Sequence, residues 1–174
     1  MGARTGGRAI ALQMLYGLDA AGSLDAEARP TLDVDAMLLR YWRAFEDSEA
    51  QNETVDPESR AFAETLVRAL LARLDAVDAA LRAASTHWRL ERMPRVDRNV
   101  ARIGAFELVD HRDTPRAVAI DEAVELGKRF GGDETAKFVN GVLERVADAA
   151  RPDEPRASQP SSGPKGGGGK RRRG

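Results

Sequence analysis

The sequence predicts an all-α fold, and three observations support this class. Aromatic residues make up only 5% of the 174 residues and alanine is abundant, a composition that favours helices over sheets. Apolar residues recur at intervals of three and four along most of the chain, as they do on the buried face of a helix. No run alternates apolar and polar residues in the way that a half-buried strand requires.

Apolar periodicity places three helices in the first half of the chain. They are expected at about 8–20, 34–47 and 57–81, and a shorter helical segment is expected at 86–92, before Pro94 interrupts the chain. The third helix is the longest, because its apolar stripe continues without a break. That stripe consists of Phe62, Leu66, Leu70, Leu74, Val77 and Leu81.

The second half continues the helical pattern. Apolar residues from Val96 to Phe106 mark one helix, and Thr114-Pro115 begins another that ends at Gly131-Gly132. Asp133 follows these glycines and is expected to cap the last helix. The helices are expected to form two small bundles, over about 1–85 and 86–150.

The stretch KFVNGVLERV (137–146) combines a turn-like Asn-Gly pair with helical spacing. Its valines and Leu143 fall on one arc of a helix, so a helix is expected despite Gly141. Phe138, Gly141 and Arg145 lie on one flank, which is typical of a platform for base stacking. The alternative is that Phe138 is part of the core and Gly141 allows close approach of a neighbouring helix. In either case Gly141 and Asn140 are expected to be packing residues: Gly141 for close approach, and Asn140 for a hydrogen bond to a neighbouring helix or loop.

Charge divides the chain into an acidic body and a basic tail. Residues 151–174 carry seven basic and two acidic side chains, which leaves residues 1–150 with a net charge of −6. The tail is rich in Pro, Gly and Ser and has no apolar periodicity, so it is expected to be disordered. Its end, KRRR at 170–173, is typical of a flexible basic arm.

The composition argues against enzymatic and membrane functions. The chain has no cysteine, and its two histidines, His87 and His111, are far apart, so no catalytic residues, metal site or cofactor are expected. No apolar run reaches the roughly 20 residues of a membrane span, and a cytoplasmic protein is expected. The carboxylates Asp121-Glu122 and Asp133-Glu134 are sequence neighbours without a nucleophile. Glu107 is expected to form an internal ion pair with Arg98 or Arg102.

Three stretches of the sequence resemble the NusB family of bacterial transcription antitermination factors. They are RAIALQMLY (8–16), VDRNVARIGAFEL (96–108) and TPRAVAIDEAVELGKRFGGDETAKFVNGVLERVA (114–147). The resemblance implies an all-helical, non-enzymatic protein that binds boxA RNA together with NusE, a small-subunit ribosomal protein. It also implies a place in the RNA polymerase antitermination complex on rRNA operons. One alternative is a homodimeric or protein-interaction helical bundle. A second alternative, the helical domain of an rRNA methyltransferase, is not expected, because this sequence contains no catalytic domain.

The resemblance also assigns site residues. RNA contacts fall on Arg4, Arg8, Glu134, Lys137 and Phe138, and NusE contacts fall on Tyr16 and Asp97. Physical alternatives remain for three of these residues. Glu134 is also a favourable charge at a helix N-terminus, Tyr16 could pack in the core, and Asp97 could pair with Arg98 or Arg102.

The N-terminal segment departs from the family pattern. Where relatives carry a dense run of arginines, this chain has ARTGGR (3–8). We therefore expect the KRRR arm to supply additional attraction for phosphates. The alternative is a solubilising tail without a role in RNA binding.

Overall fold

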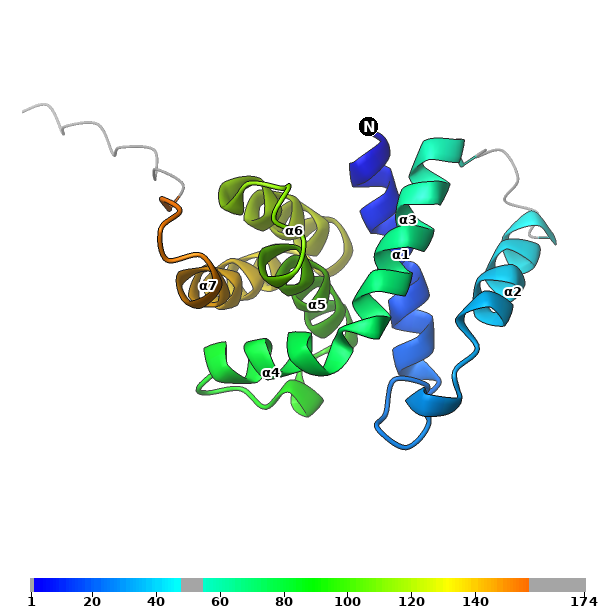
Figure 1. Ribbon diagram of the computed structural model, residues 1–174, viewed down its shortest axis with the longest axis horizontal. Helices are drawn as coiled ribbons and strands as arrows, with labels where there is room; N and C mark the ends of the chain where they lie inside the picture. Colours follow the sequence, from blue (N-terminus) through cyan, green and yellow to red (C-terminus); the bar gives the residue numbers. More distant parts are fainter. Residues whose placement is uncertain (1, 48–54, 157–174) are drawn as a thin grey trace, which may run out of the picture.

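The computed structural model describes residues 2–47 and 55–156, and it confirms the all-α fold for them (Figure 1). No strand occurs in these residues. The helices are α1 (Ala3–Ala20), α2 (Val34–Asp47), α3 (Pro57–Ala72), α4 (Leu74–Ala84), α5 (Arg95–Val109), α6 (Arg116–Gly131) and α7 (Asp133–Ala150). Two short 3₁₀ turns cover Arg29–Thr31 and Leu90–Arg92. The second of these turns is all that forms in the predicted segment 86–92.

The predicted long helix at 57–81 is divided at Arg73. There the backbone leaves helical geometry (φ −114°, ψ 9°), so that α3 ends and α4 begins in a new direction. Leu70 and Leu74, on either side of the break, are both at most 1% exposed, which explains why the apolar spacing continues across it. The α4 helix packs on α5 and α7, so the boundary between the bundles lies near Arg73, earlier than predicted.

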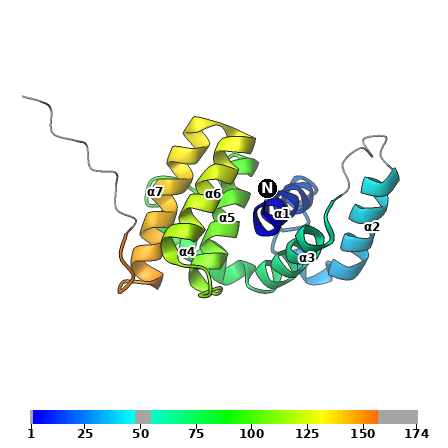
Figure 2. The ribbon, with the colours of Figure 1, turned by 90° about the horizontal axis from the view of Figure 1, so that it is seen from above.

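The two bundles share one core. In the first bundle α1 packs along α3, and α2 contributes the buried side chains of Met37, Leu38 and Trp42. The second bundle consists of α4–α7, and Figure 2 shows α5, α6 and α7 grouped on one side of α1. The α1 helix also packs on α5 and joins the two bundles.

Glycines determine the geometry of the second bundle at two points. Gly132 has a φ of 88°, a conformation that favours glycine, and it connects α6 directly to α7. It is the N-cap of α7, so the predicted capping role of Asp133 is wrong: Asp133 lies in the first turn of the helix. At Gly104 on α5 an added Cβ would overlap a methyl group of Leu143 on α7. Close helix approach therefore depends on Gly104.

A buried ion pair joins α1 to α5 and α6. Arg8 and Glu107 are 3% and 2% exposed, and the guanidinium donates to both carboxylate oxygens at 3.0 and 2.6 Å. Arg8 also donates to Glu122 on α6 at 3.2 Å. The prediction that Glu107 is buried in an ion pair is confirmed, but its partner is Arg8, and not Arg98 or Arg102.

The structured part of the chain continues past residue 150. Arg151 is 2% exposed, and its guanidinium donates at 2.7 Å to the carbonyls of Glu107, Leu108 and Thr114. The bonds to Glu107 and Leu108 satisfy carbonyls at the end of α5, where helical partners are missing, and the bond to Thr114 holds the connection to α6. The predicted boundary of the tail therefore moves from Arg151 to beyond Arg156, and the KRRR arm lies outside the described residues.

Replacing Arg8 by Met should lower the free energy of unfolding by about 3–5 kcal/mol, because the Glu107 carboxylate stays buried without its partner. The double variant Arg8→Met/Glu107→Leu should recover much of this loss. Urea denaturation at neutral pH measures both. Arg68→Met, which removes an exposed pair with Asp35, is the control and should cost less than about 1 kcal/mol. Equal losses for Arg8→Met and Arg68→Met would contradict a structural role for the buried pair.

Candidate nucleic-acid interface

The start of α7 exposes a charged pair beside an aromatic ring. Glu134 and Lys137 are 2.8 Å apart, with side chains 89% and 74% exposed. The hydrogen bond and charge of Lys137 lower the pKa of Glu134, and Glu134 in turn raises the pKa of Lys137. Both groups are therefore charged at neutral pH. Phe138 is half-buried and packs against the core, so one part of its ring remains accessible.

The flank formed by Phe138, Gly141 and Arg145 is open at its centre. A Cβ added at Gly141 would meet no atom within 4 Å, so the predicted close approach of another helix is wrong. The Asn140 side chain is exposed and has no hydrogen-bonding neighbour among the described residues, in contrast to the prediction. Arg145 donates to the carbonyl of Ala84 at 3.1 Å. The flank thus ends at an arginine that the end of α4 holds in place.

The structure separates the two N-terminal arginines that the sequence grouped. Arg4 is exposed in the first turn of α1, whereas Arg8, one turn later, is buried between Glu107 and Glu122. Its guanidinium is already committed to two carboxylates. Arg8 is therefore a core residue, and only Arg4 remains as a candidate RNA contact in this segment.

The two predicted partner contacts differ in their surroundings. Tyr16 on α1 is 42% exposed, which excludes the alternative of core packing. Asp97 in the first turn of α5 accepts a hydrogen bond from Thr135 of α7 at 2.7 Å. Arg98 and Arg102 were the expected alternative partners of Asp97, but both pair with other carboxylates.

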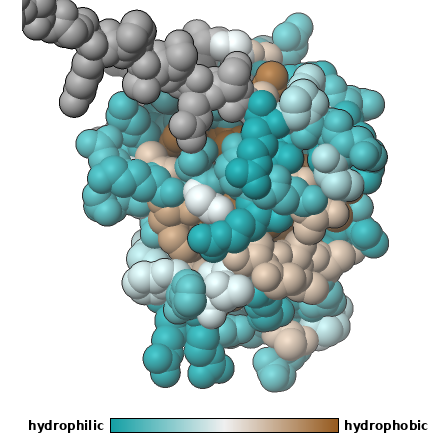
Figure 3. All heavy atoms as spheres, turned by 90° about the vertical axis from the view of Figure 1, so that its left-hand side faces the viewer, coloured by the Kyte–Doolittle hydropathy of each residue, from teal (hydrophilic) through white to brown (hydrophobic). Residues whose placement is uncertain are grey.

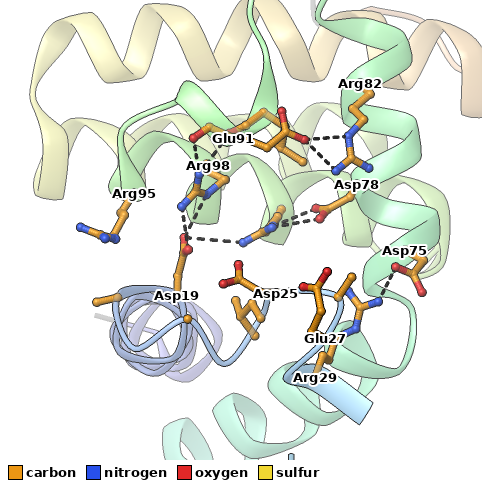
Figure 4. Close-up of a pocket in the computed structure, with 16 residues that line it drawn as sticks. Asp19, Asp25, Glu27, Arg29, Asp75, Asp78, Arg82, Glu91, Arg95 and Arg98 are labelled. Carbon is orange, nitrogen blue, oxygen red and sulfur yellow. Dashed lines mark hydrogen bonds and ion pairs between the residues drawn. The ribbon is translucent and has the colours of Figure 1, made fainter.

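Those carboxylates form a network beside a cavity of about 580 Å³ (Figure 4). Arg98 and Asn99 donate to Asp19 at the end of α1, and Arg102 donates to Asp78 of α4. Burial alone would raise the pKa of Asp19, but these hydrogen bonds and the nearby guanidinium charges hold it below its ordinary value. Both acidic and basic side chains line the cavity, and Arg95 is one of the basic ones.

The first turn of α5 connects the two candidate surfaces. Asp97 binds Thr135, two residues before Lys137, while Arg98 and Asn99 bind Asp19, one turn after Tyr16. These contacts hold the starts of α5 and α7 and the end of α1 in one rigid unit. The proposed RNA and partner contacts are therefore neighbours on a common framework.

Sequence reasoning missed a second group of aromatic and basic side chains. Trp88 is 63% exposed, and Arg89, Arg92 and Arg95, which follow it in the sequence, are also exposed. The signal in the sequence was a Trp-Arg pair followed by arginines at intervals of three. Nearby, alanines of α4 and α7 line a groove of about 340 Å³. On the side of the molecule seen in Figure 3, such small hydrophobic areas lie among hydrophilic side chains.

The described residues contain no group of three or more His, Cys, Asp or Glu side chains placed to hold a metal ion. Within the same ranges, none of the helices combines the length and apolar character needed to cross a membrane. The surface of the described residues carries exposed charged side chains and exposed aromatic rings. Such groups bind polyanions and proteins through ionic, stacking and hydrogen-bonding contacts.

Comparison with known proteins identifies the family. The NusB family model matches residues 5–148. The transcription antitermination protein NusB of Sorangium cellulosum is 49% identical and covers 85% of this chain and 94% of its own length. The NusB of Myxococcus xanthus is 46% identical, with coverages of 86% and 97%.

Solved structures show the same fold. NusB of T. maritima has a TM-score of 0.62 at 30% identity and covers 85% of this chain and 92% of its own. A structure of the antitermination factors NusB and NusE in complex with dsRNA has a TM-score of 0.67 at 21% identity, with coverages of 86% and 98%.

Asp19→Asn should lower the free energy of unfolding at pH 7 by about 2 kcal/mol, because Arg98 loses its charged partner. The folded-state pKa of Asp19 is lowered, so its contribution is present above the ordinary pKa of a carboxyl and is lost as the pH falls through the lower value. The difference between wild type and variant should therefore shrink below about pH 4. Thermal unfolding across pH measures it, with the exposed Asp75→Asn as control. A difference that is independent of pH would contradict the network.

Proposed function

The chain belongs to the NusB family, and we propose that it is a cytoplasmic transcription antitermination factor that binds boxA-type single-stranded RNA together with NusE. In this role it supports transcription of rRNA operons as part of the RNA polymerase antitermination complex. The observation that carries the proposal is the exposed start of α7, where Lys137 and Phe138 lie beside the framework that holds Asp97.

Each side chain at the start of α7 has a distinct task in this proposal. Lys137 neutralises a phosphate, which supplies affinity without sequence information. The accessible part of Phe138 stacks on an unpaired base, the usual way in which single-stranded RNA is recognised. Glu134 accepts a hydrogen bond from a base, and its ion pair with Lys137 keeps the carboxylate charged and oriented. Arg4 contributes a further phosphate contact.

NusE binds next to this site in the proposal, against Tyr16 and Asp97. Tyr16 offers an exposed ring with a hydroxyl, a combination that is frequent at protein interfaces. Asp97 offers a carboxylate whose position is fixed by Thr135. Because Thr135 lies in the same turn of α7 as Glu134, the two proteins would present one composite surface to the RNA.

The main test compares boxA RNA with a scrambled RNA, each with and without NusE. We expect NusE to increase affinity for boxA more than for the scrambled sequence, and Phe138→Ala to reduce boxA affinity about 5- to 100-fold through the loss of one stacked base. Phe45→Ala, which truncates a half-buried ring of α2, is the control for loss of packing. Fluorescence anisotropy measures affinity and calorimetry measures stability. If Phe138→Ala only lowers the melting temperature, the stacking role fails.

A second prediction concerns the basic arm. Truncation after Arg156 should weaken boxA binding and reduce its dependence on salt, since five cationic side chains are removed, Lys165 and the four at 170–173. The cut is placed there because Arg151 and Glu154 are part of the folded structure. An unchanged affinity and salt slope would show that the arm has no role in RNA binding.

A further inference from the structure

The segment 85–95, which runs from the end of α4 to the first residue of α5, presents an exposed ring on an anchored loop. Trp88 is 63% exposed, while Leu90 and Met93 of the same segment are 2% and 4% exposed. Ser85 donates a hydrogen bond to the carbonyl of Trp88 at 3.0 Å. The ring therefore stands in solvent although the backbone that carries it is fixed, a geometry that lowers the entropic cost of binding.

This segment has a positive net charge, although residues 1–150 as a whole have a negative one. It contains Arg89, Arg92 and Arg95 and a single carboxylate, Glu91. Glu91 forms an ion pair with Arg82 at 3.0 Å and a longer one with Arg89 at 3.9 Å. Arg92 and Arg95 are exposed and form no ion pair within the described residues. Their charge is therefore available to a polyanion.

Residues on either side of the segment contact α7, the helix that carries the proposed RNA site. At one end Arg145 of α7 donates to the carbonyl of Ala84, and at the other end Thr135 of α7 binds Asp97. Phe138 and Gly141 lie between these two contacts along α7, over a length of about 15 Å. A Cβ added at Gly141 would meet no atom within 4 Å, so the surface of α7 beside Phe138 is open to a ligand.

We propose that segment 85–95 is a second RNA-contact surface, which binds the single-stranded RNA that flanks boxA. Trp88 stacks on a flanking base, and Arg89 and Arg92 neutralise neighbouring phosphates. An exposed aromatic ring on a positively charged segment is the combination that binds single strands without strong sequence preference. This proposal rests on the proposed function, since it extends the path of the same RNA.

The test uses two RNAs with the protein–NusE complex: boxA alone, and boxA extended on both sides by about ten nucleotides of unrelated sequence. A matched pair carries a scrambled core. We expect Trp88→Ala to weaken binding of the extended boxA RNA about tenfold and to leave binding of the short RNA unchanged. Trp88→Phe, which keeps a stacking ring, should retain most of the affinity. Val118→Ala, at another exposed hydrophobic residue, is the control.

Fluorescence provides an independent readout because the chain has only two tryptophans. Trp42 is 4% exposed in the core, whereas Trp88 is 63% exposed, so quenching by RNA reports mainly on Trp88. The extended RNA should quench the emission and the short RNA should not. The Trp88→Phe variant should lose this response while it still binds.

The arginines are tested through salt dependence. Arg92→Ala should reduce the salt slope for the extended RNA by about one, as expected for the loss of one phosphate contact. Arg40→Ala, at an exposed arginine of α2, should leave the slope unchanged.

Several results would overturn the proposal. They are equal effects of Trp88→Ala on short and extended RNA, no effect on either, or a loss of NusE binding, which would make the segment a protein contact. Failure of the proposed function has a different signature. In that case the wild-type complex would not distinguish boxA from the scrambled core, whatever the response of Trp88 to the flanks.

Discussion

The arrangement of the molecule depends on the buried guanidinium of Arg8. It lies between Glu107 of α5 and Glu122 of α6, so a single side chain attaches α1 to two helices of the second bundle. Burying these charges is costly, and only the bidentate geometry and the second carboxylate offset that cost. Because α1 is held in this way, Arg4 stays at the surface one turn away. The same contact removes Arg8 from any role at the RNA.

Arginine ion pairs join helices at several points in the described residues. The pairs are Arg98 with Asp19, Arg102 with Asp78, and Arg116 with Glu144 and Asp148. Burial would lower the pKa of Arg116, but hydrogen bonds to Asp148 and Glu144 raise it, so its charge is secure. Much of the basic character of the sequence is therefore structural. A count of arginines overstates the charge available to a nucleic acid.

Apolar spacing was sufficient to predict the all-α fold, and α2 begins and ends at the predicted residues. It could not predict the break at Arg73, because Leu70 and Leu74 keep the spacing of one helix although they pack in two directions. Nor could local pattern show that Arg8 would be buried, since its partner Glu107 is 99 residues away. Exposure of the 85–95 segment could not be predicted for a different reason, because buried and exposed residues follow one another there without a regular period.

The distribution of charge explains why RNA binding by this protein is expected to need several partial contacts. The body carries a net charge of −6, so long-range attraction to RNA is weak and opposed. Lys137, a candidate phosphate contact at the start of α7, is itself paired with Glu134. Affinity must then accumulate from separate sources: stacked aromatic rings, a few unpaired arginines and the surface of a second protein. Contacts linked on one rigid framework reinforce one another, since each that forms raises the effective concentration of the next.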